Sequence, residues 1–124
     1  MKVIIAGSRT IKDFDDIDKA LGIAAEMGIT KESITEIVSG GATGADKFGE
    51  LYAKCNHLPV KVFLPDWTKH GRAAGPIRNK QMVDYADALI AVWDGKSKGT
   101  LSTIKYAQEK GIQICVYTPP GGGK

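Results

Sequence analysis

The chain has 124 residues, of which 43% are hydrophobic and 25% charged, and its formal net charge at pH 7 is +3. This length and composition fit one globular domain and exclude disordered and fibrous classes. No apolar run reaches the length of a membrane span, and the N-terminus lacks a signal-peptide pattern. We therefore expect a cytoplasmic protein without membrane contact, and the small positive charge is compatible with anionic partners.

Five short runs rich in β-branched residues predict five strands. They cover residues 3–6, 36–39, 60–64, 88–93 and 112–117. Each run is continuously apolar rather than alternating, which is typical of parallel strands buried on both faces of a sheet.

Four stretches with helical periodicity lie between these runs, at about residues 14–27, 44–56, 76–85 and 99–110. Asp13 is expected to cap the first helix and Gly28 to follow its end, and the fourth helix is expected to stop at Gly111. Thr43 and Asp46 have the spacing of a capping box at the start of the second helix. The alternation predicts an α/β fold, a three-layer Rossmann-like doubly wound parallel sheet with helices on both faces. It forms one domain over residues 1–117, followed by a flexible tail at 118–124.

The unusual segments all follow strands, so we expect them at the carboxyl edge of the sheet, where ligands bind in such folds. Two glycine-rich turns, at 40–44 and 95–99, each lead into a helix. Such turns expose backbone N–H groups at the positive end of the helix dipole and accommodate phosphate. Glycine in one turn is as well explained by tight packing, but two turns with arginines nearby favour phosphate binding.

Several side chains near these turns have two readings. Trp67 could stack on a nucleobase or cover the core. Arg78, expected in the first turn of the third helix, opposes the helix dipole there and therefore calls for an anionic partner. Asp46 is explained by capping alone, whereas Asp94 could accept a ribose hydroxyl. Both carboxylates are weak catalytic candidates.

The cysteines give no sign of a metal site. Cys55 and Cys115 lie sixty residues apart without a second cysteine or histidine cluster nearby, so we expect reduced, partly buried thiols and no metal. We also expect no required cofactor.

Four motifs in order carry a family resemblance that covers nearly the whole chain to about residue 117. They are Gly-Ser-Arg-Thr at 7–10, Ser-Gly-Gly-Ala-Thr-Gly-Ala-Asp at 39–46, Asp-Trp-x-x-x-Gly-x-x-Ala-Gly-x-x-Arg-Asn at 66–79 and Asp-x-x-Ser-x-Gly-Thr at 94–100. Together they resemble the YspA/YpsA-related branch of the SLOG superfamily. This resemblance implies a Rossmann-like domain that binds nucleotides or nucleotide-derived ligands at the carboxyl edge, often as a homo-dimer or higher homo-oligomer.

Two relatives within the superfamily suggest different activities. The Lonely Guy phosphoribohydrolases have an Arg-x-x-x-Met helix, similar to residues 78–82 here, and a Gly-Thr-x-x-Glu segment, similar to Gly99 and Thr100. The position of their carboxylate is Thr103, which cannot stabilise an oxocarbenium-like centre. The single-stranded DNA loader DprA has a glycine motif similar to residues 39–46, but this chain has only nine aromatic residues to stack on bases.

We therefore expect binding of a nucleotide or nucleotide-derived ligand, by a sensor or a ligand-sequestering module. The alternatives are hydrolysis or transfer at the N-glycosidic bond of a nucleoside monophosphate and, as a minor reading, single-stranded DNA binding. The expected ligand-binding residues are Gly7, Ser8, Arg9, Thr10, Gly40, Gly41, Thr43, Gly44, Asp46, Trp67, Arg72, Arg78, Asn79, Asp94, Ser97, Gly99 and Thr100.

Overall fold

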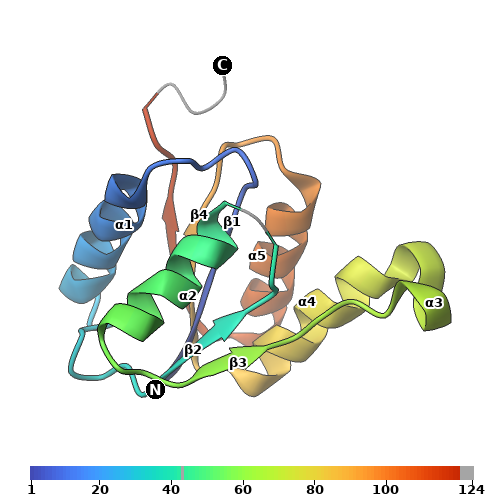
Figure 1. The fold of residues 1–124 in the computed structure, drawn as a ribbon, viewed down its shortest axis with the longest axis horizontal. Helices are drawn as coiled ribbons and strands as arrows, with labels where there is room; N and C mark the ends of the chain where they lie inside the picture. The colour runs from blue at the N-terminus through green and yellow to red at the C-terminus, as the bar shows by residue number, and fades with distance from the viewer. Residues whose placement is uncertain (43, 121–124) are drawn as a thin grey trace.

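The computed structural model describes residues 1–42 and 44–120. Five parallel strands form one sheet in the order β3-β2-β1-β4-β5 (Figure 1). The strands are β1 (Lys2–Gly7), β2 (Glu36–Ser39), β3 (Val60–Val62), β4 (Ala88–Val92) and β5 (Gln113–Tyr117). The chain runs from β1 outward to β3 and then returns to the other side of β1 with β4. The order therefore reverses between β1 and β4, and the predicted Rossmann-like α/β fold is confirmed.

Helices cover both faces of the sheet (Figure 1). The helices α1 (Phe14–Glu26) and α2 (Ala45–Cys55) pack on one face, and α4 (Ala74–Tyr85) and α5 (Lys98–Lys110) pack on the other. Alternate residues of β1 serve the two cores: Val3 and Ile5 join the first, and Ile4 and Ala6 the second. This division explains why the central strand is continuously apolar.

The expected signals at the ends of α1 and α5 are present. The Asp13 carboxylate accepts a hydrogen bond from the Asp15 N–H at 2.9 Å, and Gly28, just beyond the end of α1, has a φ of +94°. Gly111 ends α5 in the left-handed region, with φ +81°. The left-handed region is unfavourable in free energy for any residue that has a Cβ atom. Glycine is therefore the favoured residue at such helix ends.

The predicted capping box at α2 is wrong in its register. The N-cap is Gly44, which has no side chain, so Asp46 is the second residue of the helix rather than the third. Its carboxylate reaches back to the Ala42 N–H at 3.3 Å. Thr43, the other member of the predicted box, lies outside the described residues.

The strand β3 is not buried on both faces, because it forms an edge of the sheet. Val60 and Val62 are 37% and 41% exposed. The strand ends at Val62, not at residue 64, and Leu64 beyond it is 70% exposed. Strand order decides which strand lies at an edge, and the apolar run itself carries no information on that order.

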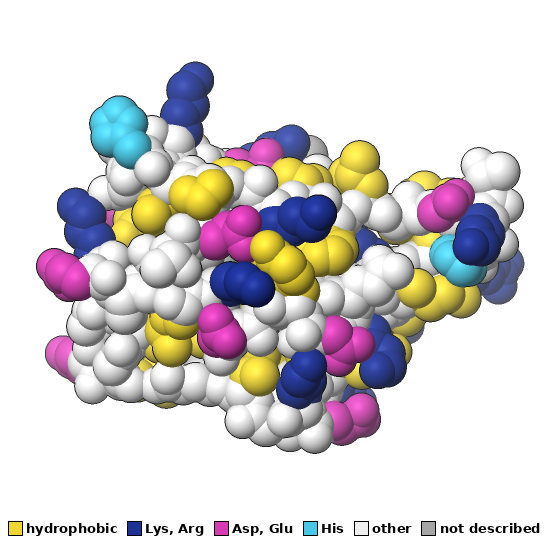
Figure 2. Space-filling model, turned by 90° about the horizontal axis from the view of Figure 1, so that it is seen from below, with side chains coloured by type: hydrophobic (Ala, Val, Ile, Leu, Met, Phe, Trp, Pro, Cys, Tyr) yellow, Lys and Arg dark blue, Asp and Glu magenta, His cyan; other side chains and the backbone are white. Residues whose placement is uncertain are grey.

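A short helix α3 (Trp67–His70) and a 3₁₀ turn η1 (Gly71–Ala73) precede α4 and were not predicted. They project from the body of the molecule as an arm (Figures 1 and 2). Because α4 begins at Ala74, Arg78 is its fifth residue and lies beyond the first turn.

Three remaining expectations concern the cysteines, the tail and membrane contact. Cys115 is buried, but Cys55 is exposed, so the predicted partial burial is wrong for Cys55. Residues 118–120 form no helix or strand, and residues 121–124 lie outside the described part. Among the described residues, no helix combines the length and apolar character needed to cross a bilayer.

Candidate functional site

A cavity of about 360 Å³ opens at the carboxyl edge of the sheet, beside the point where the strand order reverses. Its walls come from the segment after β1, the glycine turn before α2, the helix α4 and the start of α5. Ten of the predicted ligand-binding residues line it, namely Gly7, Arg9, Thr10, Asp46, Arg78, Asn79, Asp94, Ser97, Gly99 and Thr100.

Asp46 is the buried acidic group of this cavity, only 5% exposed. Burial raises its pKa from 3.8 to about 6, although the Ala42 amide, the nearby charge of Arg78 and the Gly7 amide oppose that rise. A carboxyl group that titrates close to neutral pH in a cleft can donate or accept a proton. Of the two catalytic candidates, Asp46 has the environment for such a role.

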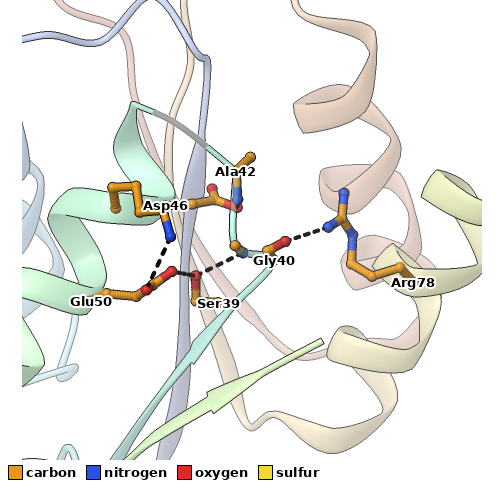
Figure 3. Close-up of polar contacts among 8 residues, drawn as sticks. Ser39, Gly40, Ala42, Asp46, Glu50 and Arg78 are labelled. Carbon is orange, nitrogen blue, oxygen red and sulfur yellow. Dashed lines mark hydrogen bonds and ion pairs between the residues drawn. The ribbon is translucent and has the colours of Figure 1, made fainter. Parts of the chain in front are cut away.

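Arg78 faces Asp46 from α4, with the Gly40 backbone between them (Figure 3). One terminal nitrogen donates to the Gly40 carbonyl at 2.6 Å, and Nε donates to Asn79 Oδ1 at 2.9 Å. Burial lowers the pKa of Arg78, partly offset by Asp46, while Arg9 lowers it further. Neutral oxygen atoms therefore orient the guanidinium, and among the described residues no carboxylate forms an ion pair with it.

Each glycine of the 40–44 turn has a structural reason, which is close packing, a positive φ or both. A Cβ on Gly40 would lie 2.8 Å from the Arg78 guanidinium and 2.9 Å from Asp46 Oδ2. Gly44 has φ +75°, and a Cβ there would lie 2.4 Å from the Ser8 carbonyl oxygen. Gly41 has φ +73° and donates its N–H to Ser39 Oγ at 3.1 Å.

The backbone amides of Gly41 and Ala42 thus bond to protein oxygen atoms within the turn and the helix that follows it. The prediction that this turn offers open N–H groups to phosphate is therefore wrong for these two amides. Ser39 also donates to Glu50 Oε2 at 2.7 Å, which ties the turn to α2 (Figure 3).

Asp94 organises the turn before α5. One carboxylate oxygen accepts from the Lys96 and Ser97 amides, both at 2.8 Å, and the other accepts from Thr10 Oγ1 at 3.1 Å. The two amides chiefly lower its pKa to about 2. As a carboxylate, Asp94 therefore joins the loop after β1 to the turn before α5. These hydrogen bonds occupy much of its capacity to accept a hydrogen bond from a ligand hydroxyl.

The first turn of α5 forms the far wall of the cavity. Ser97 caps the helix by accepting from the Thr100 N–H at 3.4 Å. Thr103 is buried and donates to the Gly99 carbonyl at 3.2 Å, which also accepts from Asn79 at 3.3 Å. Thr103 thus lies on the cavity wall, at the position where the resemblance to Lonely Guy enzymes calls for a carboxylate.

Other predicted residues lie outside the cavity lining. Ser8 is buried behind it and accepts from the Asp94 N–H at 2.9 Å. Trp67 is 57% exposed on α3, so it does not cover the core, and Arg72 is exposed on η1. Gly40, Gly41 and Gly44 shape the turn without lining the cavity. The binding roles of these residues remain predictions, as do those of the residues that line the cavity.

Four lining residues were absent from the predicted ligand-binding set, namely Ala6, Ala42, Met82 and Thr103. Ala6 and Ala42 have no polar side-chain group, so only their place beside the strand ends could have indicated them. Met82 and Thr103 belong to the segments that are similar to the Lonely Guy motifs, and that similarity was the available signal for them. Glu50 was missed as well, although it follows Asp46 by one helical turn and therefore shares its face of α2.

Across residues 1–42 and 44–120, no group of three or more His, Cys, Asp or Glu side chains could hold a metal ion.

The fold is that of a Rossmann-like α/β domain, with a cavity beside the point where the strand order reverses. The chain belongs to the family described as "YspA, cpYpsA-related SLOG family", whose model matches residues 1–70. It is 34% identical over 119 residues to the Gene 61 protein of Mycobacterium phage D29, covering 91% of this chain and 93% of that protein.

A solved structure supports the fold. The DNA processing protein A (DprA) from Streptococcus pneumoniae superposes with a TM-score of 0.68 at 19% sequence identity. The alignment covers 97% of this chain and 50% of DprA, so the chain spans about half the length of that protein. At this identity the likeness concerns the fold alone.

Proposed function

We propose that this protein binds a nucleotide or a nucleotide-derived ligand in the cavity at the carboxyl edge, as a sensor or a ligand-sequestering module. The observation that carries the proposal is that Arg9, Arg78 and the start of α5 meet at one cavity. Membership of the SLOG family supports a nucleotide-related role. The volume of about 360 Å³ falls within the range of small-molecule pockets, about 300–1,000 Å³.

The phosphate group fits best at the start of α5. The first four amides of a helix have no carbonyl partner within it. Ser97 supplies partners for Thr100 and Leu101, which leaves the amides of Lys98 and Gly99 for a ligand. Gly99 lines the cavity, and a Cβ on it would meet no atom within 4 Å, so the backbone is open on that side. The helix dipole adds a favourable field for an anion there.

The two arginines supply the countercharge. Neither Arg9 nor Arg78 forms an ion pair within the described residues, whose ion pairs are made by lysines. Arg9 is exposed at the mouth, whereas Arg78 is fixed by carbonyl and amide oxygen atoms. Because oriented guanidinium groups bind phosphate with paired hydrogen bonds, these residues favour a phosphorylated ligand over a neutral one.

A thermal-shift screen against nucleoside mono- and diphosphates and cyclic nucleotides tests this proposal. A ligand at 100 times its dissociation constant adds about 2.7 kcal/mol to the free energy of unfolding. We expect Arg78→Gln and Arg9→Gln to reduce the shift, and Lys54→Gln, remote on α2, to retain it. If no nucleotide shifts the transition and single-stranded DNA is retained in a salt-sensitive manner, nucleic-acid binding replaces the proposal.

Asp46 favours a second function, cleavage or transfer at the N-glycosidic bond of a nucleoside monophosphate. Thr103 lacks the carboxylate of the Lonely Guy enzymes, but Asp46 supplies a carboxyl group in the same cavity. Incubation with nucleoside monophosphates and detection of free base tests this activity, with Asp46→Asn as the matched variant. Release no faster than from Asp46→Asn or a protein-free control would exclude it.

A further inference from the structure

Asp46 is a buried carboxyl group in the lining of the cavity. It lines the cavity and is 5% exposed, and its hydrogen-bond donors are the backbone amides of Ala42 and Gly7. In the part of the chain that the structure describes, no Lys, Arg or His nitrogen lies close enough to the Asp46 carboxylate, within 4.0 Å, to form an ion pair. Its direct hydrogen-bond donors are therefore neutral, and the charge of Arg78 stabilises the carboxylate only from a distance.

Charged groups from four elements surround Asp46. Arg78 of α4 faces it across Gly40, and Arg9 lies on the loop after β1 (Figure 3). Glu50 follows by one turn of α2 and disfavours the charged form of Asp46, although its own carboxylate accepts from Ser39. Asp94, on the turn after β4, stays ionised because backbone amides bind it. Two arginines and two other carboxylates thus surround Asp46. An added anion would therefore favour the protonated form of Asp46.

We propose that Asp46 takes up a proton when a phosphate-bearing ligand enters the cavity, so that this residue makes binding pH-dependent and senses the phosphate. The proposal rests on the nucleotide-binding function proposed above. The proton comes from solvent and resides on the carboxyl group of Asp46, and no covalent bond to the ligand forms. A neutral Asp46 can then donate a hydrogen bond to a phosphate oxygen instead of repelling it.

The charge of a ligand phosphate and the protonation of Asp46 are coupled because both groups lie in the same cavity. Asp46 lines this cavity, and the Debye length at physiological ionic strength is about 8 Å, so salt does not fully screen two charges that share the cavity. Inside a cavity the screening by salt is weaker than in bulk solution. A phosphate dianion anywhere in the cavity therefore raises the pKa of Asp46 above its ligand-free value.

The direction of the pH dependence follows from linkage. Without ligand Asp46 is mostly protonated below pH 5 and mostly ionised above pH 7, because its pKa is about 6. If the complex requires the protonated form, the apparent affinity is constant at low pH and falls about tenfold per pH unit above about pH 6.

The test measures the dissociation constant of inorganic sulfate between about pH 5 and 8 by calorimetric titration. Sulfate is a dianion with no pKa in this range, whereas a phosphate monoester titrates near pH 6 itself. Wild type is compared with Asp46→Asn, whose amide oxygen can still accept from Ala42, and with Glu50→Gln, which removes the neighbouring carboxylate outside the cavity lining. We expect affinity to fall roughly 100-fold for wild type and Glu50→Gln from pH 5 to 8, and to change less than about threefold for Asp46→Asn.

A second measurement ties the effect to the ligand's phosphate. Adenosine 5′-monophosphate is titrated at pH 7.5 in buffers of different ionisation enthalpy, which reports the protons taken up. We expect about one proton for wild type, fewer for Asp46→Asn, and none when adenosine replaces the nucleotide. Binding with the same pH dependence in wild type and Asp46→Asn would overturn the proton uptake and leave nucleotide binding intact. If neither sulfate nor the nucleotide binds at any pH, both proposals fail.

Discussion

The two turns of the carboxyl edge, at 40–44 and 95–99, both begin and end with glycine but have different structural roles. The 40–44 turn is closed, since a Cβ on Gly40, Gly41 or Gly44 would lie 2.8, 2.8 or 2.4 Å from the nearest protein atom, and the amides of Gly41 and Ala42 bond within the protein. The 95–99 turn is open, since a Cβ on Gly95 or Gly99 would meet no atom within 4 Å. The difference shows that glycine content predicts a tight turn but does not distinguish packing from ligand access.

The largest expected effect is the loss of stability on Gly44→Ala, in the closed turn. Gly44 has φ +75° and ψ −131°, and the new Cβ would lie 2.4 Å from a backbone oxygen that cannot rotate away. Strain and overpacking together should lower the free energy of unfolding by about 3 kcal/mol. Urea unfolding checks this value, and a loss below about 1 kcal/mol would mean that the turn is not closed.

A smaller effect should follow Asp94→Asn, which loosens the open turn. The folded pKa of Asp94 is about 2 and its ordinary value is 3.8, so its contribution to stability is complete above pH 4 and is lost as the pH falls towards 2. We expect a loss of about 1 kcal/mol near neutral pH, of the order of one hydrogen bond, shrinking between about pH 4 and 2.

Thermal unfolding as a function of pH measures the difference between wild type and Asp94→Asn. The exposed Asp18→Asn on α1 serves as the control, for which we expect no such pH-dependent gap. A gap for Asp94→Asn that is constant from pH 2 to 7 would contradict the role of the carboxylate in joining the two loops.

The smallest effect, and one of opposite sign, is expected for Gly99→Ala. Gly99 is the second residue of α5 and has an open Cβ position, so alanine should stabilise the helix by up to about 1 kcal/mol. Urea unfolding alongside Gly44→Ala provides the direct comparison. Destabilisation by more than about 1 kcal/mol would show that the second turn is closed as well.

The sequence allowed the fold to be predicted because its signals are local. Apolar runs and the caps Asp13, Gly28 and Gly111 set the elements, and their alternation set the parallel sheet. The edge position of β3 could not be predicted in this way, because strand order depends on packing between distant segments. The helix α3 was missed for a related reason, since a single turn has too little periodicity to detect.

The candidate site was predicted in part. Placing the loops after β1, β2 and β4 at one edge identified Arg9, Asp46 and Asp94 as neighbours of one cavity. Their relative roles were not accessible, because they depend on burial and hydrogen bonds. Asp46 is buried and its pKa is raised, whereas Asp94 bonds to amides and its pKa is lowered. Trp67 and Arg72 lie on the α3 and η1 arm, whose direction no local signal encodes.

The exposed edge strand β3 bears on the behaviour of the protein in concentrated solution. An open edge with apolar side chains invites pairing with another chain, and natural sheets counter this with short edge strands and lysines. Here β3 has three residues, and Lys61 stands between the exposed Val60 and Val62. Lys61 and the brevity of β3 thus act against aggregation, so exchanging Lys61 for an apolar residue would remove a safeguard of solubility while leaving the cavity untouched.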